Sequence, residues 1–228
     1  MVVLEGQRVQ ERKLIVMKAV IFDFDGTIAD SSYVWKKVDE DFFRARGMDV
    51  PEDYVDAIST MSFVSGAVYT KEKYNLPETV EDIMAEWNVH ALKEYAENVK
   101  LKPYAREYIA EYKNKGYKIG RATASNPEFY MPVLEREGII GWFDAFADGI
   151  SGVRNKDYPD IYILCAEKMG VSPENCFVYE DILKGVRSAK SAGMTVTAVY
   201  DEGNRDRWQE TKKEAHHFIM SFRECLSL

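Results

Sequence analysis

The sequence predicts an α/β protein: a doubly wound parallel sheet of the Rossmann-like kind, with a helical domain inserted after the first strand. Three observations support this fold class. The run Ala19–Phe22 is continuously apolar, which is typical of a strand that helices cover on both faces. Residues 31–100 then show helical patterns and no convincing strand. From Pro103 onward strand and helix patterns alternate, and right-handed crossovers make such strands parallel.

The inserted helical segment carries start and stop signals of its own. Asp30, Ser31 and Ser32 are candidate N-caps for its first helix. Gly47 is the expected end of that helix. Further on, the sequence Thr79–Asp82 resembles a capping box. An amphipathic stripe predicts a helix directly after it: Val80, Ile83, Met84, Trp87 and Ala91.

Beyond the insert, glycines, prolines and apolar runs divide the chain into alternating elements. Gly116, Gly170 and Gly193 each follow an amphipathic segment and predict the end of a helix. Pro132 is expected to kink or shorten the helix that begins at Pro127. Helices are therefore expected over 103–115, from 127, over 159–169 and over 184–192, and strands over 117–123, 145–147, 176–179, 195–200 and, at the edge, 217–220.

Length and composition restrict the domain organisation. A chain of 228 residues is long enough to bury a sizeable core. Hydrophobic residues make up 46% and charged residues 30%, which excludes a disordered chain. We expect an N-terminal extension over 1–16, a core domain over 17–30 and 101–228, and a helical domain over 31–100.

Charge and cysteine content restrict the partners and the compartment. The formal net charge of −8 argues against a nucleic acid or an anionic membrane as partner. The run Leu14–Phe22 is too short to span a bilayer. Cys165, Cys176 and Cys225 have neither disulfide-framework nor zinc-site spacing, so a reducing, cytoplasmic location is expected. We expect a monomer or a weak homodimer.

Polar side chains follow four of the predicted strands at the points where those strands end. Ligands of open parallel sheets bind at this carboxyl edge. Acidic groups there suit Mg²⁺, which binds oxygen ligands and commonly takes one or two carboxylates with water and substrate phosphate. A lysine and a hydroxyl suit the oxygens of a phosphoryl group. The residues are Asp23, Asp25, Gly26 and Thr27, then Thr123, Ala124, Ser125 and Asn126, then Lys156, and finally Glu180 and Asp181.

These motifs resemble those of the haloacid dehalogenase superfamily. Asp23–Thr27, which reads Asp-Phe-Asp-Gly-Thr, is similar to its first motif, and Thr123 to its second. Lys156 is similar to the third motif, and Glu180 with Asp181 to the fourth. Their order and spacing match over about nine-tenths of the chain. The position of the helical insert resembles the subgroup with an α-helical cap, which includes phosphoglycolate-type phosphatases and β-phosphoglucomutases.

The resemblance implies a Mg²⁺-dependent phosphatase that hydrolyses a small phosphorylated metabolite, a phosphomonoester, through an aspartyl-phosphate. Asp23 would be the nucleophile, and Asp25 the general acid and base. Asp23, the Asp25 carbonyl and Asp181 would hold the metal. Glu180 would bind the metal or orient its surroundings, and Lys156 would offset negative charge. The implied substrate-binding residues are Phe24, Thr123, Ala124, Ser125, Asn126 and Lys156, of which Thr123 and Lys156 are also catalytic.

Asp25 favours phosphate-ester chemistry over the other activities of the superfamily, because the dehalogenases lack an acid at that position. The β-phosphoglucomutases have a histidine twelve residues beyond the nucleophile, where this chain has Trp35. A sugar phosphomutase is therefore the alternative, ranked below a phosphatase. A non-catalytic binding module ranks lower still, because the residues of all four motifs are present.

Some assignments leave alternatives open. Ser125 competes with Thr123 as the hydroxyl that binds the phosphoryl group. Lys156 stands in Lys-Asp-Tyr-Pro-Asp, where the family usually has Lys-Pro-x-Pro-Asp. Ile182 stands where a small polar residue is usual. Four aromatic residues of the insert are expected mainly in its own core, although an exposed member could contact substrate: Trp35, Phe42, Trp87 and Tyr95.

Overall fold

The computed structural model describes residues 18–58, 61–154 and 156–226, so the N-terminal extension expected over 1–16 lies outside the described residues. A six-stranded sheet lies at its centre, and all neighbouring strands in it are parallel. The predicted fold class is therefore confirmed. In spatial order the strands are β5 (Ala145–Ala147), β4 (Lys118–Ala122), β1 (Ala19–Phe22), β6 (Cys176–Glu180), β7 (Thr195–Val199) and β8 (His217–Ile219).

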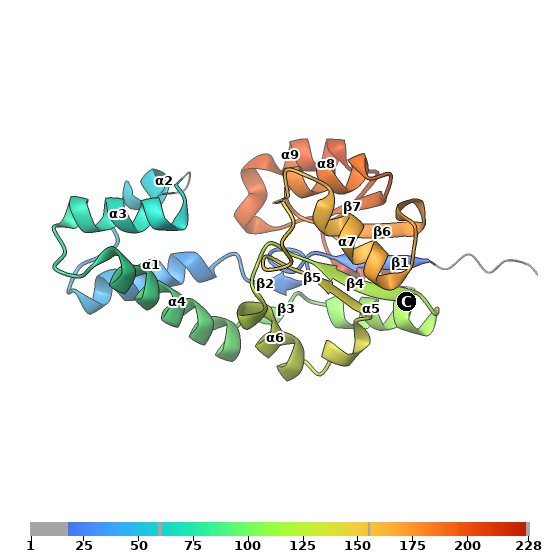
Figure 1. Cartoon of the computed structure of the whole chain (residues 1–228), viewed down its shortest axis with the longest axis horizontal. Helices are drawn as coiled ribbons and strands as arrows, with labels where there is room; N and C mark the ends of the chain where they lie inside the picture. Colours follow the sequence, from blue (N-terminus) through green and yellow to red (C-terminus); the bar gives the residue numbers. More distant parts are fainter. Residues whose placement is uncertain (1–17, 59–60, 155, 227–228) are drawn as a thin grey trace, which may run out of the picture.

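Helices cover both faces of this sheet (Figure 1). The central strand β1 is buried from both sides. Ala19 and Ile21 join the apolar cluster on one face, and Val20 and Phe22 join the cluster on the other. This double burial explains why the strand is apolar throughout rather than alternating. One face carries α7 (Asp160–Met169), α8 (Leu183–Ser191) and α9 (Trp208–Glu214), and the other carries α5 (Ala105–Asn114) and α6 (Pro127–Arg136).

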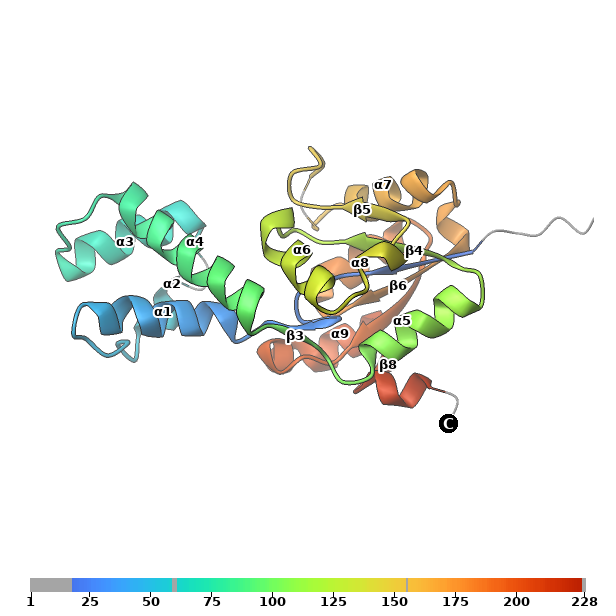
Figure 2. The ribbon, with the colours of Figure 1, turned by 90° about the horizontal axis from the view of Figure 1, so that it is seen from below.

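The helices α1 to α4 form a separate block beside the sheet (Figures 1 and 2). A two-stranded antiparallel ribbon, which pairs Ala29 with Leu101 and Asp30 with Lys100, joins this helical block to the core. The sequence analysis missed the ribbon because each of its strands has only two residues. The elements are β2 (Ala29–Asp30), α1 (Val34–Ala45), α2 (Tyr54–Ile58), α3 (Phe63–Tyr74), α4 (Val80–Glu97) and β3 (Lys100–Leu101).

Polar contacts fix the junction between the helical block and the core. Lys102 Nζ lies 2.8 Å from Asp201 Oδ2 and donates to the carbonyls of Gly26 and Tyr200. Arg136, the last residue of α6, donates to three backbone carbonyls around the C-terminal end of α4. These carbonyls would otherwise lack partners at the helix end. The end of α4 is thereby tied to the core.

The start of α1 differs from the prediction. The expectation that Asp30, Ser31 or Ser32 caps this helix is wrong, because Tyr33 occupies the N-cap position. The two serine hydroxyls donate instead to carboxylates of the core, Ser31 to Asp25 at 2.8 Å. Stronger acceptors outside the helix therefore draw these hydroxyls away from its first turn. By contrast, the capping box predicted at the start of α4 is confirmed.

The helices α6 and α9 differ from what their sequences suggest. Pro132 lies inside α6 and does not end it. The sequence analysis missed α9, whose seven residues bury only Trp208 and Thr211 and therefore give little apolar periodicity. In the described part of the chain, we find no helix of the length and apolarity needed to cross a bilayer.

Arg121 on β4 is a charged residue in the middle of the core. Its side chain is fully buried, and its three nitrogens have no hydrogen-bond partner within the described residues. The guanidinium carbon lies 3.1 Å from the centroid of the Tyr130 ring, with the Phe24 and Phe146 rings also near. Burial lowers the pKa of Arg121, although neighbouring acidic groups act in the opposite direction. Its desolvation is therefore compensated by ring stacking rather than by hydrogen bonds.

We predict that Arg121→Met stabilises the protein, by about 1–3 kcal/mol in the free energy of unfolding. Methionine fills a similar space among the aromatic rings and needs no hydrogen-bond partners. Equilibrium denaturation of the variant and the parent protein measures the difference. Arg136→Met is the matched control and should be destabilising, because that guanidinium binds the end of α4. A loss of stability in Arg121→Met would show that stacking and nearby negative charge outweigh desolvation.

Candidate active site

The chain bends directly after β1, and the bend places Asp23 at the carboxyl edge of the sheet. The Asp23 N–H donates to the carbonyl of Tyr179 on β6 at 3.0 Å, which continues the strand pairing. Gly26 has a φ of +72°, a left-handed conformation that favours glycine. A Cβ at Gly26 would also overlap the Asp181 carboxylate. This position therefore requires glycine both for its backbone and for the space beside it.

Three acidic side chains gather at this edge. Asp23, Glu180 and Asp181 are buried, and one carboxylate oxygen of each lies within 4.8 Å of the others. The parallel pairing of β1 with β6 brings them together, because both strands end here. Burial raises the pKa of Glu180 to about 7, and the negative charge of Asp23 acts in the same direction. Burial also raises the pKa of Asp181 well above its usual range.

Lys156 places a positive charge inside this acidic cluster. Its Nζ lies 2.5 Å from Asp23 Oδ1 and 2.8 Å from Glu180 Oε2. Burial alone lowers the pKa of Lys156, but the charges of Asp23 and Glu180 outweigh burial and hold the pKa above its usual range. Tyr162 Oη also donates to Glu180 Oε2, at 2.7 Å. A Cβ at Gly185 would overlap the Glu180 side chain, so this glycine leaves room for the carboxylate.

Asp181 has a different set of partners. Thr27 Oγ1 donates to Asp181 Oδ1 at 2.9 Å and lies 3.2 Å from Asp23 Oδ2. Asn204 Nδ2 donates to Asp181 Oδ2 at 2.5 Å. The threonine therefore links the carboxylates that follow two different strands. The Thr27 hydroxyl and the Asn204 amide are uncharged, so they do not neutralise the carboxylates that they contact.

The oxygen atoms of this cluster fit a divalent cation. Carboxylates are the ligands that a hard cation such as Mg²⁺ takes from proteins. Glu180 Oε2 already binds Lys156 and Tyr162, whereas Asp23 Oδ2 and Asp181 contact no cationic group of the described residues. Asp23 and Asp181 are therefore the better candidates for metal ligands, and Glu180 is better placed to hold Lys156.

The Asp25 carboxylate is held apart from this cluster by three hydroxyl groups. Ser31 Oγ and Tyr95 Oη donate to Asp25 Oδ1, at 2.8 Å and 2.5 Å. Ser125 Oγ donates to Asp25 Oδ2. These donors come from the start of the helical block, from α4 and from the loop after β4. Burial raises the pKa of Tyr95 far above its usual range, with the Asp25 charge acting in the same direction, so the phenol stays protonated as a donor.

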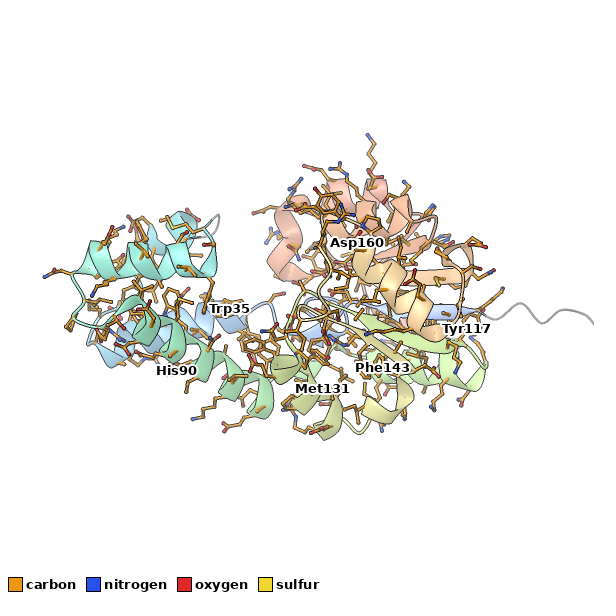
Figure 3. The ribbon with its side chains drawn as sticks, in the orientation of Figure 1. Trp35, His90, Tyr117, Met131, Phe143 and Asp160 are labelled. Atoms are coloured by element: carbon orange, nitrogen blue, oxygen red, sulfur yellow. The ribbon has the colours of Figure 1, made fainter. Side chains whose placement is uncertain are left out.

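A cavity of about 510 Å³ opens in front of Asp25, between the helical block and the core. Ala124, Ser125 and Asn126 line it, as the sequence analysis predicts for substrate-binding residues. Thr123 is buried just behind them, with its Oγ1 accepting from the Ser125 N–H at 3.3 Å. The helical block contributes further side chains, and Figure 3 shows Trp35 on its side toward the core. The lining residues from the block and from the segment between β2 and α1 are Ser31, Ser32, Trp35, Phe63, Asn88 and Tyr95.

Two of the predicted residues lie elsewhere. Phe24 is fully buried, with its ring in the core 5.9 Å from that of Tyr130, so only its main chain can reach a substrate. Lys156 lines a smaller cavity of about 160 Å³ on the other side of Ala124, together with Asp148. The ammonium group nevertheless contacts Asp23, as described above.

The structure brings further polar residues into contact with the motif carboxylates, in roles that the sequence analysis did not give them. Ser31, Tyr95 and Asn204 contact the motif carboxylates, and Thr27 joins two of them. The sequence analysis placed Thr27 at this edge of the sheet, as part of the first motif, but gave it no role of its own. Tyr95 was placed in the core of the helical insert, where its apolar spacing fits equally well. Nothing in the sequence shows that α4 ends beside Asp25.

Comparisons with known proteins point to one family. The family of haloacid dehalogenase-like hydrolases matches residues 17–193. Hexitol phosphatase B of Escherichia coli is 31% identical over 77% of this chain and 80% of its own length. The β-phosphoglucomutase of Bacillus subtilis is 30% identical over 80% of this chain and 83% of its own length.

A solved structure gives the same result for the fold. The CbbY protein of Rhodobacter sphaeroides, solved in complex with xylulose 1,5-bisphosphate, has a TM-score of 0.73 and 25% identity, over 92% of this chain and 96% of that one. The predicted resemblance and the predicted class of enzyme, a hydrolase, are thereby confirmed. From the family match and these relatives, the chain belongs to the haloacid dehalogenase-like hydrolases.

Proposed function

We propose that this protein is a Mg²⁺-dependent phosphatase that hydrolyses a small sugar or polyol phosphate through an aspartyl-phosphate at Asp23. The observation that carries this proposal is that the two aspartates of the first motif, Asp23 and Asp25, lie in different environments. Asp23 contacts Lys156 within the buried acidic cluster. Asp25 faces the large cavity and is held by three hydroxyl groups. Two carboxylates held so differently suit a nucleophile and a proton-transfer group.

In the first step, a carboxylate oxygen of Asp23 attacks phosphorus, and Asp25 protonates the leaving oxygen. The Lys156 ammonium offsets the negative charge that builds up as carboxylate and phosphoryl group approach. The backbone N–H groups and hydroxyls of residues 123–126 bind the phosphoryl oxygens at the carboxyl edge of the sheet. In the second step, Asp25 takes a proton from water, which attacks the aspartyl-phosphate and releases phosphate.

Mg²⁺ would be held by the Asp23 and Asp181 carboxylates and the Asp25 carbonyl. When bound, the cation would offset the charge of these groups and of the phosphoryl oxygens. Thr27 and Asn204 hold the Asp181 side chain in place for this purpose. Glu180 is proposed to orient Lys156, because both groups are buried and in contact.

The helical block is proposed to be a cap that covers the substrate, with residues 31–100 as the cap and 17–30 with 101–228 as the core. The large cavity lies between the two and takes side chains from each. Covering this cavity would exclude bulk water during the first step. Residues of the block would then select the leaving group, while the sheet edge binds the phosphoryl group.

A phosphatase is favoured over a phosphomutase by the lining of the large cavity. Among the described residues, the cavity wall contains Asp25 and Asp181 but no lysine, arginine or histidine. A mutase of the β-phosphoglucomutase type must also hold a second phosphate, which needs cationic partners. The related hexitol phosphatase and a 28% identical phosphatase of phosphorylated carbohydrates from Thermotoga maritima support a sugar or polyol leaving group.

We predict that Asp23→Asn abolishes phosphate release, by about a thousand-fold or more in kcat, since an amide cannot form the covalent intermediate. The assay follows phosphate release from phosphomonoesters with Mg²⁺ and with EDTA. Calorimetry of Mg²⁺ binding should show weaker affinity in the variant. Asp30→Asn, an exposed acid on the ribbon, is the control and should keep both properties.

Other outcomes of this assay point to the alternatives. Conversion of β-glucose 1-phosphate to glucose 6-phosphate with a bisphosphate primer, without phosphate release, would favour the mutase. Full phosphate release by Asp23→Asn, or release that EDTA leaves unchanged, would contradict the proposed mechanism.

We predict that Tyr95→Phe lowers kcat/KM for alkyl phosphates by about ten-fold, because it removes one of the donors that orient Asp25. The phenyl ring still packs against Phe129, 5.3 Å away between ring centroids. Esters with a good leaving group, such as p-nitrophenyl phosphate, need less protonation and should lose several times less. The parameter kcat/KM reports the steps up to the breaking of the ester bond. The later role of Asp25, as the base that takes a proton from water, therefore does not affect it.

The control for this prediction is Tyr33→Phe, which removes an exposed hydroxyl that donates to Glu94 at 3.0 Å. It should affect both classes of ester equally and weakly. An equal loss on alkyl and p-nitrophenyl phosphates in Tyr95→Phe would assign Tyr95 a packing role rather than a role in orienting Asp25.

A further inference from the structure

Asp201 is a buried acid that follows β7 at the carboxyl edge of the sheet, outside the acidic cluster, and is only 5% exposed. Its carboxylate contacts both chain segments that connect the helical block to the core. Ser32 Oγ, from the first crossing (residues 29–33), donates to Asp201 Oδ1. Lys102 Nζ, from the second crossing (residues 98–102), lies 2.8 Å from Asp201 Oδ2. One carboxylate therefore holds the two crossings together.

The turn that begins at Asp201 packs closely against the first crossing. The Gly203 N–H donates to Asp201 Oδ1 at 2.9 Å, so this oxygen accepts from the turn and from Ser32 together. A Cβ at Gly203 would lie 2.7 Å from the Ser32 Cβ, which is too close for two carbon atoms. Glycine is needed here because the two segments approach so closely. The first crossing therefore cannot shift toward the turn without displacing it.

The same turn reaches the acidic cluster. Asp201 is the N-cap of a short helix, Glu202–Arg207, and its carbonyl accepts from the Asn204 N–H at 3.1 Å. The Asn204 side chain donates to Asp181 Oδ2 at 2.5 Å. The turn thus connects the acid that holds the two crossings to the amide that holds Asp181.

Asp181 needs a fixed donor because a second carboxylate lies near it. A Cβ at Gly26 would overlap Asp181 Oδ2 and would lie 3.3 Å from Asp201 Cγ. The two carboxylates therefore approach the same glycine, and their negative charges repel one another. Lys102 compensates the charge of Asp201, while the Asn204 amide restrains the side chain of Asp181.

We propose that Asp201 is a positioning residue that acts on Asp181 through Asn204, and that it thereby makes the affinity for Mg²⁺ depend on the junction with the helical block. The inference rests on the proposed function, in which Asp181 is a metal ligand. It adds to that function a residue outside the four motifs. Groups that orient a metal ligand commonly change metal affinity by about 10–100-fold. Because such coupling is reciprocal, a bound cation would in return hold the crossings more firmly.

The competing explanation is that Asp201 acts only as a negative charge that attracts the cation from a distance. A double-mutant cycle with Asn204 separates charge from position. The positional effect requires the Asn204 amide, whereas the attraction of a charge persists when this amide is removed.

The quantity to measure is the dissociation constant of Mg²⁺, by calorimetry. We expect Asp201→Ala to raise this constant about ten-fold in the parent protein. When Asn204→Ala is already present, the further increase should be less than about two-fold. The matched control is Asp206→Ala, which removes an exposed acid of the same short helix and should keep the parent value.

Amide hydrogen exchange tests the reciprocal effect without any substitution at Asp201. The Lys102 N–H donates to the Ile28 carbonyl at 2.8 Å, so its exchange reports on the second crossing. Saturating Mg²⁺ should slow this exchange at least about three-fold in the parent protein. In Asn204→Ala, saturating Mg²⁺ should leave it unchanged.

Two results would overturn the inference. One is an equal effect of Asp201→Ala on Mg²⁺ affinity with and without the Asn204 amide. The other is exchange of the Lys102 N–H that Mg²⁺ does not slow in the parent protein. Failure of the parent protein to bind Mg²⁺ would instead contradict the proposed function.

Discussion

The acidic cluster at the end of β1 and β6 is the constraint on which the rest of the structure depends. Asp23, Glu180 and Asp181 are buried within 4.8 Å of one another, and Lys156 is the cation among them. Two like charges about 4 Å apart repel by about 4 kcal/mol at an effective dielectric constant of 20. The six-stranded sheet must therefore supply enough packing energy to hold this arrangement. A bound cation would relieve this repulsion, as the proposed mechanism requires.

Holding three carboxylates so close also restricts the backbone around them. Gly26 and Gly185 each lie where a Cβ would overlap a carboxylate, of Asp181 and Glu180 respectively. A larger residue at either place would push the acid out of the cluster, without touching the apolar core. These glycines therefore belong to the site as much as the charged groups do. Glycine is required at both positions because a carboxylate lies close to the backbone there, and at Gly26 also because the backbone is left-handed.

The sequence was sufficient for the parts of the fold that repeat a local pattern. The apolar run of β1 and the capping box before α4 predicted their elements, and strand ends predicted which carboxylates would meet. The sequence did not predict the partners of Asp25, because contacts of Ser31 and Tyr95 with it depend on how the helical block docks. Ser31 was expected to cap α1, since a serine before a helix has the same local pattern in both roles.

Distance from the junction divides the residues of the helical block into two groups. Tyr95 lies in the last turn of α4, next to the carbonyls that Arg136 binds, so its position relative to Asp25 is fixed by the core. Asp39 on α1 lines a separate cavity of the block and not the cavity in front of Asp25. Substitutions at Asp39 therefore leave the three hydroxyl groups that donate to Asp25 in place. Substitutions at Tyr95 affect both the cavity lining and the partners of Asp25, because Tyr95 lines the cavity and its hydroxyl donates to Asp25. Under the proposed function, substitutions that change the block without disturbing Asp25 are therefore expected away from the junction with the core.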